Sequence, residues 1–460
     1  MKSFTFIGRQ LPVRAGLCLV AGILSHALAD ENNGIHFGAA GWMQYSVIGS
    51  SSDSGDNSNY RHNAFDGKSV LSPGAQLSLD GRLSERLHIA AGLGVVAGNT
   101  IPYSPTGING GYALPGLDAY VSNANFTYTF QNSHSSNVSL TGGLFSYDYN
   151  PDVKNLGLYL LRGPVYPGIL ISGFETKHVL PVANMLGLQL HHQMGAFQQD
   201  FLLSSEMEFY PFFDLSPAYV ASYQVNSAFH IGAGVNFYHL IPVDSKLTSG
   251  LRSDEITHWQ YDDTTGGKSD TTELSYSGTK LMVNASFDPK SLFGGAEWLG
   301  PEDLKLYSEV ALIGLDNGPA YRKIYGDYLH RMPVMVGFNI PTRKYLDHLS
   351  LEVEWYGSPD EDNLDNYTVQ GSSHPVSPFP TNWNQNSKSL NFNAKRDNWK
   401  WSLHGVRTIQ KHVQLSFQIA DDHYRPGIYH GYGDANPPYH EAILVTPKDW
   451  YFTTKLAYFF

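Results

Sequence analysis

The sequence of 460 residues predicts an all-β protein, a transmembrane antiparallel β-barrel of about sixteen strands with short turns at one end and long loops at the other. Three observations favour this fold. Apolar and polar residues alternate along many segments, short connections alternate with long ones, and only 16% of the residues are charged. Soluble proteins average roughly 25% charged residues. A wall with lipid on one side and water on the other accounts for all three.

Composition also excludes several classes of protein. The formal net charge of -12 argues against nucleic-acid binding, which needs concentrated Lys and Arg. Aromatic residues make up 13% of the chain, far more than disordered chains carry. After the N-terminal region, no apolar run approaches the roughly 18 residues that a membrane-spanning helix needs. We therefore expect a folded protein that is neither disordered nor helical in the membrane.

The N-terminal residues 1–29 have the pattern of a secretory signal. Its parts are a basic n-region, an apolar h-region and an A-x-A cleavage site, formed by Lys2, Arg9 and Arg14, by 16–24 and by 27–29. We expect residues 30–460 to form a single barrel domain. The only cysteine, Cys18, lies within the signal, so neither a disulfide nor a thiol nucleophile is expected in the exported chain.

Two-residue alternation is clearest at the C-terminus. One face of the expected strand 447–460 carries Trp450, Phe452, Thr454, Leu456, Tyr458 and Phe460, and the other face carries polar residues. The same period recurs in 87–95, 349–356 and 412–420. Period-two segments alone fit a soluble β-sandwich as well as a barrel, so the connections must decide between the two.

Connection lengths favour the barrel, because outer-membrane barrels alternate short turns with long loops. The expected strands are 35–48, 73–83, 87–98, 117–130, 137–149, 168–178, 185–198, 215–225, 228–240, 271–287, 303–315, 328–341, 347–357, 397–408, 412–422 and 447–460. Strands six to eight have the weakest patterns, which leaves a range of about fourteen to eighteen. The even number suits a closed antiparallel barrel, and both termini then lie at the turn end.

The last eleven residues resemble the C-terminal assembly signal of Gram-negative outer-membrane β-barrels. The resemblance rests on the terminal Phe460 and on the alternating apolar residues before it, Trp450, Phe452, Leu456 and Tyr458. It implies recognition by the barrel-assembly machinery and insertion into the outer membrane, among lipid and lipopolysaccharide. The loop pattern extends a general resemblance to porin-like barrels over the exported chain, without a named subfamily. The acidic constriction loop of many diffusion porins is not recognisable in the sequence.

If the apolar faces meet lipid, the polar faces line a lumen wide enough for water. Passive diffusion of small polar solutes is therefore the expected function. The charged or titratable pore-lining candidates are Lys280, Lys305, Glu309, Arg331, Glu352, Glu354, Lys400, His404 and Lys455. Opposed charges on neighbouring strands would set up a transverse field that selects polar solutes. The alternative, that these residues are paired and only structural, has about equal weight.

Aromatic residues are concentrated near the expected strand ends and in the long loops, and acidic residues are concentrated in the long loops. Those near strand ends fit interfacial girdles: Tyr45, Tyr128, Tyr147, Tyr149, Phe237, Tyr238, Trp355, Tyr356, Trp399, Trp401 and Trp450. In the loop 423–446, candidate residues for binding a sugar or peptide are Tyr424, Tyr429, His430, Tyr432, Tyr439 and His440. The histidine spacing there disfavours a metal site, and the acidic stretch 358–366 is either a Ca²⁺-binding loop or, more simply, a solvated one.

No catalytic motif in its required context is found, and we expect neither an enzyme nor a cofactor. The glycine pattern at 92–97 lies in an expected strand with no helix after it, and Ser277 to Lys280 matches S-x-x-K without the later partner motif. Two alternatives to a channel stay open. One is a structural or surface-binding barrel plugged by its own loops, and the other is a membrane-embedded hydrolase.

Overall fold

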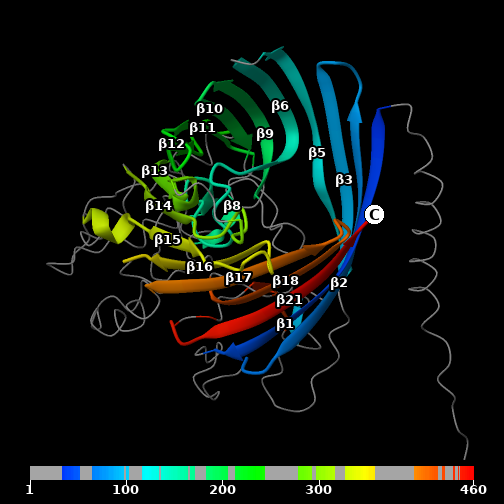
Figure 1. Ribbon diagram of the computed structural model, residues 1–460, viewed down its shortest axis with the longest axis vertical. Coiled ribbons are helices and arrows are strands. Elements are labelled where there is room, and N and C mark those ends of the chain that lie inside the picture. The colour runs from blue at the N-terminus through cyan, green and yellow to red at the C-terminus, as the bar shows by residue number, and fades with distance from the viewer. Residues whose placement is uncertain are drawn as a thin grey trace, which may run out of the picture.

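The computed structural model describes residues 34–51, 65–97, 100–102, 117–133, 136–163, 166–170, 183–205, 213–243, 278–292, 297–315, 327–357, 398–422, 427–429, 439–440, 444 and 446–460. Sixteen strands close a single barrel, as Figure 1 shows. In barrel order they are β1 (Ile35–Ser50), β2 (Ser69–Arg82), β3 (Leu87–Ala97), β5 (Leu117–Asn132), β6 (Ser136–Tyr147), β9 (Ala183–Met194), β10 (Phe197–Ser205), β11 (Leu215–Gln224), β12 (Phe229–Tyr238), β13 (Gly278–Phe287), β14 (Leu306–Leu312), β15 (Val334–Asn339), β16 (His348–Trp355), β17 (Trp399–Ile409), β18 (Val413–Asp421) and β21 (Trp450–Phe459). The predicted all-β fold is confirmed.

Every strand pairs antiparallel with its sequence neighbour in the barrel, and the first and last strands close the ring. The seam between β1 and β21 runs from the pair Ala40 and Phe459 to the pair Ser50 and Trp450. Its end is secured by Phe460, whose backbone N–H donates to the carbonyl of Ala39 at 2.8 Å. The described short turns and both ends of the barrel chain therefore lie at one rim, as the sequence predicts.

The outer surface of the barrel is apolar. Large hydrophobic side chains are exposed on strand after strand, among them Met43, Leu77, Leu93, Phe126, Leu188, Phe201, Ile231, Val283, Val336, Leu351, Leu415 and Leu456. The four exposed residues of the expected assembly signal, Trp450, Leu456, Tyr458 and Phe460, lie on this surface, and Phe452 is partly exposed. Such an outer band is what a lipid-facing wall requires.

The strand count of sixteen is confirmed, but two of the predicted positions are wrong. The described part of the expected strand 168–178 is not in the barrel, because 168–170 belong to β8 (Tyr166–Leu170), which pairs with β7 (Arg162–Gly163) in a separate sheet. The rest of that strand, 171–178, lies outside the described residues. The expected loop 199–214 instead contains β10. A two-residue turn joins β9 to β10, and Gly195 in it has φ +59°, which glycine adopts without strain. One strand gained there compensates for the one lost.

Glycine and aromatic residues face one another across the barrel strands. The indole of Trp42 covers Gly74, its partner in register, so that a Cβ at that glycine would lie 2.1 Å from the ring. Tyr120 covers Gly94 in the same way, with a corresponding distance of 2.2 Å. Aromatic rings thus replace the missing glycine side chains. The abundance of glycine and the abundance of tyrosine in the sequence therefore share a structural cause, which is a thin and tightly packed wall.

Few elements lie outside the barrel in the described part of the chain. Two 3-10 helices, η2 (Pro289–Leu292) and η4 (Tyr328–Arg331), occupy connections. Three short strands, β4 (Thr100–Pro102), β19 (Gly427–Tyr429) and β20 (Tyr439–His440), form a separate sheet. Among the residues described, no helix is both long and apolar enough to cross a membrane. The expected signal at 1–29 lies outside the described residues.

Candidate functional site

The connection after β6 enters the barrel. Residues 148–163, called here the inward segment, pack their apolar side chains against inward residues of the wall. Leu160 is fully buried in a cluster with Met185 of β9, Met282 of β13 and Met335 of β15. Figure 1 shows β8, which follows this segment, inside the ring of barrel strands. The lumen is therefore narrowed by the chain itself, although no such constriction was recognisable in the sequence.

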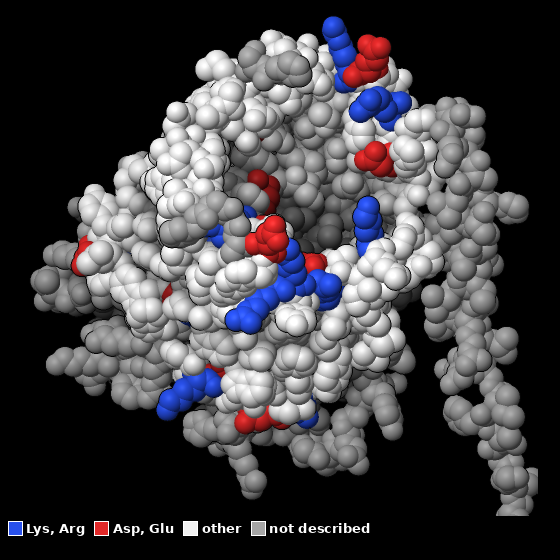
Figure 2. Space-filling model, in the orientation of Figure 1, with Lys and Arg blue, Asp and Glu red and all other residues white. Residues whose placement is uncertain are grey.

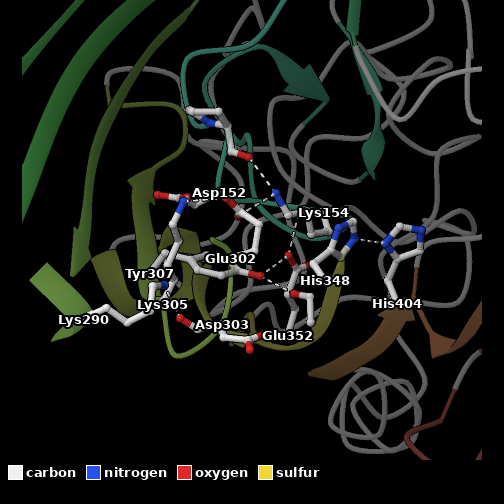
Figure 3. Close-up of polar contacts among 12 residues, drawn as sticks. Asp152, Lys154, Lys290, Glu302, Asp303, Lys305, Tyr307, His348, Glu352 and His404 are labelled. Carbon is white, nitrogen blue, oxygen red and sulfur yellow. Dashed lines mark hydrogen bonds and ion pairs between the residues drawn. The ribbon is translucent and has the colours of Figure 1, made fainter. Parts of the chain in front are cut away.

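Glu352 on β16 holds the middle of the inward segment. One carboxylate oxygen accepts hydrogen bonds from the backbone N–H groups of Asn155 (2.9 Å) and Leu156 (2.7 Å). The other accepts from the backbone N–H of Lys154 at 2.6 Å and from the hydroxyl of Tyr307 at 2.9 Å. Figure 3 shows the carboxylate with this hydroxyl. Four donors converge on one side chain that is only 1% exposed.

Glu309 on β14 forms a second anchor. It accepts hydrogen bonds from the hydroxyl of Tyr149 at 2.8 Å, the side-chain amide of Asn150 at 3.0 Å and the backbone N–H of Tyr159 at 2.8 Å. Both ends of the inward segment thus meet at one buried carboxylate. Hydrogen bonds to a charged acceptor are worth more than neutral ones, so this anchor and Glu352 fix the segment against the wall.

Three further hydrogen bonds tie the inward segment to other strands. They run from Tyr159 Oη to Glu354 (2.7 Å), from Asn155 Nδ2 to Asp422 (2.6 Å) and from Asn236 Nδ2 to the carbonyl of Leu160 (2.9 Å). Their wall partners come from β16, from the end of β18 and from β12. The segment is consequently held from several sides of the lumen.

Lys400 on β17 contacts a second chain segment inside the barrel. Its ammonium group donates to the carbonyl of Leu444 at 2.7 Å and lies 3.3 Å from Asp421. Leu444 itself is buried against Ile48 and Tyr451 of the first and last barrel strands. The connection between β18 and β21 is therefore also packed against the inner wall at Leu444.

The remaining cationic candidates are distributed around the wall. Lys280 is fully buried, with its ammonium 5.3 Å from the ring centre of Tyr238, and Lys455 is 5.3 Å from the ring centre of Trp42. Arg331 is buried near β14 and donates to backbone carbonyls that follow this strand. Such contacts are cation–π and backbone interactions, so these three side chains are engaged by the wall itself.

Lys305 and His404 lie nearer the turn rim. Lys305, just before β14, donates to Glu302 at 2.8 Å and to Asp152 of the inward segment at 3.2 Å, as Figure 3 shows. Burial lowers the pKa of Lys305, but these two carboxylates outweigh burial and raise that pKa above its ordinary value. His404 shares a 3.0 Å hydrogen bond with His348 on the neighbouring strand. Among the nine candidates, the structure brings Lys305, Glu309, Glu352 and Glu354 together around the inward segment.

Several aromatic residues that the sequence places in interfacial girdles are instead buried inside the barrel. Tyr45, Phe237, Trp399 and Trp450 are exposed on the outer surface, as a girdle requires. By contrast, Tyr147, Tyr149, Tyr238 and Tyr356 are buried within the barrel, so the girdle interpretation is wrong for them. Tyr149 serves as a donor to Glu309. Sequence reasoning missed this role, because a tyrosine near a strand end gives no sign of which side of the wall it faces.

The loop candidates lie largely beyond the described residues. Tyr424, His430 and Tyr432 are outside them. Tyr429 ends β19, and Tyr439 and His440 form β20, which pairs with β19 along the backbone. The acidic stretch 358–366 also lies outside the described residues.

The wall formed by β1, β2, β3 and β5 is polar on its inner face and partly open to solvent. The ion pair of His88 and Asp80, 2.9 Å apart, has side chains that are 39% and 61% exposed. Ser78, Asn125 and Thr127 are partly exposed on the same face. Figure 2 shows the molecule hollowed in this view. Solvent therefore reaches polar side chains on the wall away from the main anchors of the inward segment.

Comparisons with known proteins give a likeness of fold only. No family model and no curated protein matches the chain. Among solved structures, an engineered triple mutant of Rhodopseudomonas blastica porin has 7% identity and a TM-score of 0.40, covering 93% of this chain and 100% of that one. Another engineered variant of the same porin has 8% identity and a TM-score of 0.41, with the same coverage. Likeness at this level supports no conclusion about this chain, and the closed antiparallel barrel is established by its own strand pairing.

Proposed function

We propose that this barrel is an outer-membrane channel through which small polar solutes diffuse passively. The observation that carries the proposal is that polar side chains on the inner face of β1, β2, β3 and β5 are accessible to solvent. The inward segment therefore does not fill the lumen beside this wall. Barrels of sixteen strands are wide enough for an aqueous passage. The inward segment would set the width of that passage, and the opposite wall would supply hydrogen-bonding groups to the solute.

The membrane assignment belongs to the same proposal. The exposed apolar band of the strands supports contact with lipid and lipopolysaccharide, and the apolar C-terminal strand supports recognition by the barrel-assembly machinery. An expected signal at the N-terminus supports export in a Gram-negative cell. We propose a channel rather than an enzyme, since the buried carboxylates Glu309 and Glu352 are occupied with holding the inward segment.

A plugged barrel is the second candidate, and one observation favours it. Both the inward segment and Leu444 lie against the inner wall, held by buried carboxylates and by Lys400. If they closed the lumen completely, the protein would serve a structural or surface-binding role. Conduction measurements separate the two candidates.

The test is conductance of the purified full-length protein in planar lipid bilayers. A channel shows stepwise conductance that scales with salt concentration. Ser78→Trp, on the inner face of β2, should reduce the step size, whereas Leu77→Trp on the outer face should leave it unchanged. Absence of conductance in the unmodified, folded protein would reject the channel in favour of the plugged barrel.

A further inference from the structure

A cavity of about 420 Å³ lies between the start of the inward segment and the inner faces of β10 to β13. Its lining includes residues beside the short turns, among them Gln224, Ser227 and Asp288, so the cavity lies at the turn end of the barrel. It is therefore distinct from the open wall of β1 to β5. Its volume is within the range of small-molecule sites, roughly 300 to 1,000 Å³.

The charge around this cavity is predominantly negative. Four carboxylates line it, those of Asp148, Asp152, Asp200 and Asp288. Three ammonium groups belong to the same network: Lys305, which Asp152 shares with Glu302, Lys154, which lies 3.8 Å from Glu302, and Lys290, which lies 3.1 Å from Asp288. Asp200 is already engaged, because His191 lies 2.8 Å from it and the side chains of Gln189, Gln198 and Tyr147 donate to it. Figure 3 shows Lys305 directed toward Asp152 and Glu302. A positively charged ligand would meet a favourable field in this partly desolvated space.

Neutral hydrogen-bonding groups complete the lining. Gln198 projects from β10, Ser222 from β11 and Ser286 from β13. These amides and hydroxyls suit the hydroxyl groups of a solute. Within the described part of the chain, no group of three or more His, Cys, Asp or Glu could hold a metal ion. The cavity is also much larger than one ion, and its mixed lining fits a molecule with an ammonium group and several hydroxyls.

We propose that this cavity is a binding site for a hydroxylated primary amine of the size of an amino sugar. The carboxylates of the inward segment hold the ammonium group, and the neutral side chains of β10, β11 and β13 bind the hydroxyls. The proposal deepens the proposed function, on which it rests, because it assigns a class of solute to the turn end of the channel.

The experiment is isothermal titration calorimetry of the folded full-length protein in detergent, with glucosamine as the probe and glucose as its uncharged counterpart. Glucosamine should bind at least tenfold more tightly than glucose. Asp148→Asn keeps an oxygen that can accept from the backbone of Asn150, and should weaken glucosamine binding about tenfold by removing one charge. Asp327→Asn, at an exposed carboxylate that caps η4 and lies outside the cavity lining, is the matched control and should leave binding unchanged.

A second variant keeps the test decisive if Asp148→Asn does not fold. Ser222→Lys adds a positive charge inside the cavity from a partly exposed position on β11, and should reduce glucosamine affinity by more than tenfold. Equal binding of glucose and glucosamine, or glucosamine binding unaffected by the folded cavity variants, would overturn the proposal. Calorimetry does not depend on conduction, so binding without conductance would reject the channel and retain the site.

Discussion

Replacement of Glu352 by glutamine should release the middle of the inward segment. Each carboxylate oxygen of Glu352 accepts two hydrogen bonds. The NH2 group of the amide fits best in place of the oxygen that Tyr307 contacts, because the Tyr307 hydroxyl can turn to accept from it, and the backbone N–H of Lys154 then loses its acceptor. A hydrogen bond to a charged group contributes about 1.5 to 3 kcal/mol. The bond lost at Lys154 therefore costs roughly 1.5 to 3 kcal/mol of local stability, because the N–H left behind has little access to water.

Hydrogen exchange of the folded protein in detergent measures this cost directly. In Glu352→Gln, the amide of Lys154 should exchange roughly ten to a hundred times faster, from the conversion of 1.4 kcal/mol per factor of ten. Glu354→Gln is the matched control. The hydroxyl of Tyr159 can turn to donate to the remaining amide oxygen, so exchange should rise less than tenfold. Unchanged exchange of the Lys154 amide in Glu352→Gln would refute the anchoring role.

Two further predictions concern Asp303, beside the short turns, and Gly157, in the inward segment. Burial raises the pKa of Asp303, but N–H donors from Gly300, Thr342 and Arg343 and the Thr342 hydroxyl outweigh it and lower that pKa. The stabilisation that ionised Asp303 contributes is complete above the pKa of the unfolded state, about 3.9, and is lost as the pH falls through the lower pKa of the folded state. In urea unfolding at pH 3 to 7, the free energy of unfolding of Asp303→Asn should therefore fall less on acidification than that of the unmodified protein. Gly157→Ala places a Cβ at φ +88°, 2.8 Å from Met335, and should destabilise the inward segment by roughly 1 to 3 kcal/mol, measurable as faster proteolysis of 148–163 with an intact barrel.

The barrel was predictable because its signals are local. Alternation in β16 shows that Glu352 and Glu354 share one face, and the apolar neighbours Leu351 and Val353 identify that face as the inner one. The turn at Gly195 was missed because two residues interrupt the alternation too briefly to separate β9 from β10. Local patterns thus establish the faces of strands better than the boundaries between them.

The constriction was not predictable, because its contacts join distant regions of the chain. Glu352 and Asn155 are separated by 197 positions, and neither carries a sequence signal for the other. Backbone N–H groups, which supply most of the donors to Glu352, leave no trace in residue identity at all. Sequence reasoning could place Glu352 in the lumen but had no means of identifying the inward segment as its partner.

The seam between β1 and β21 also bears on the order of assembly. An open barrel leaves two strand edges unpaired, and unpaired backbone groups are costly in lipid. Here β21 supplies both closing ladders, one with β1 and one with β18, and the N–H of Phe460 extends the first of them. Closure therefore depends on delivery of β21, and removal of this strand would leave the edges of β1 and β18 exposed to other chains.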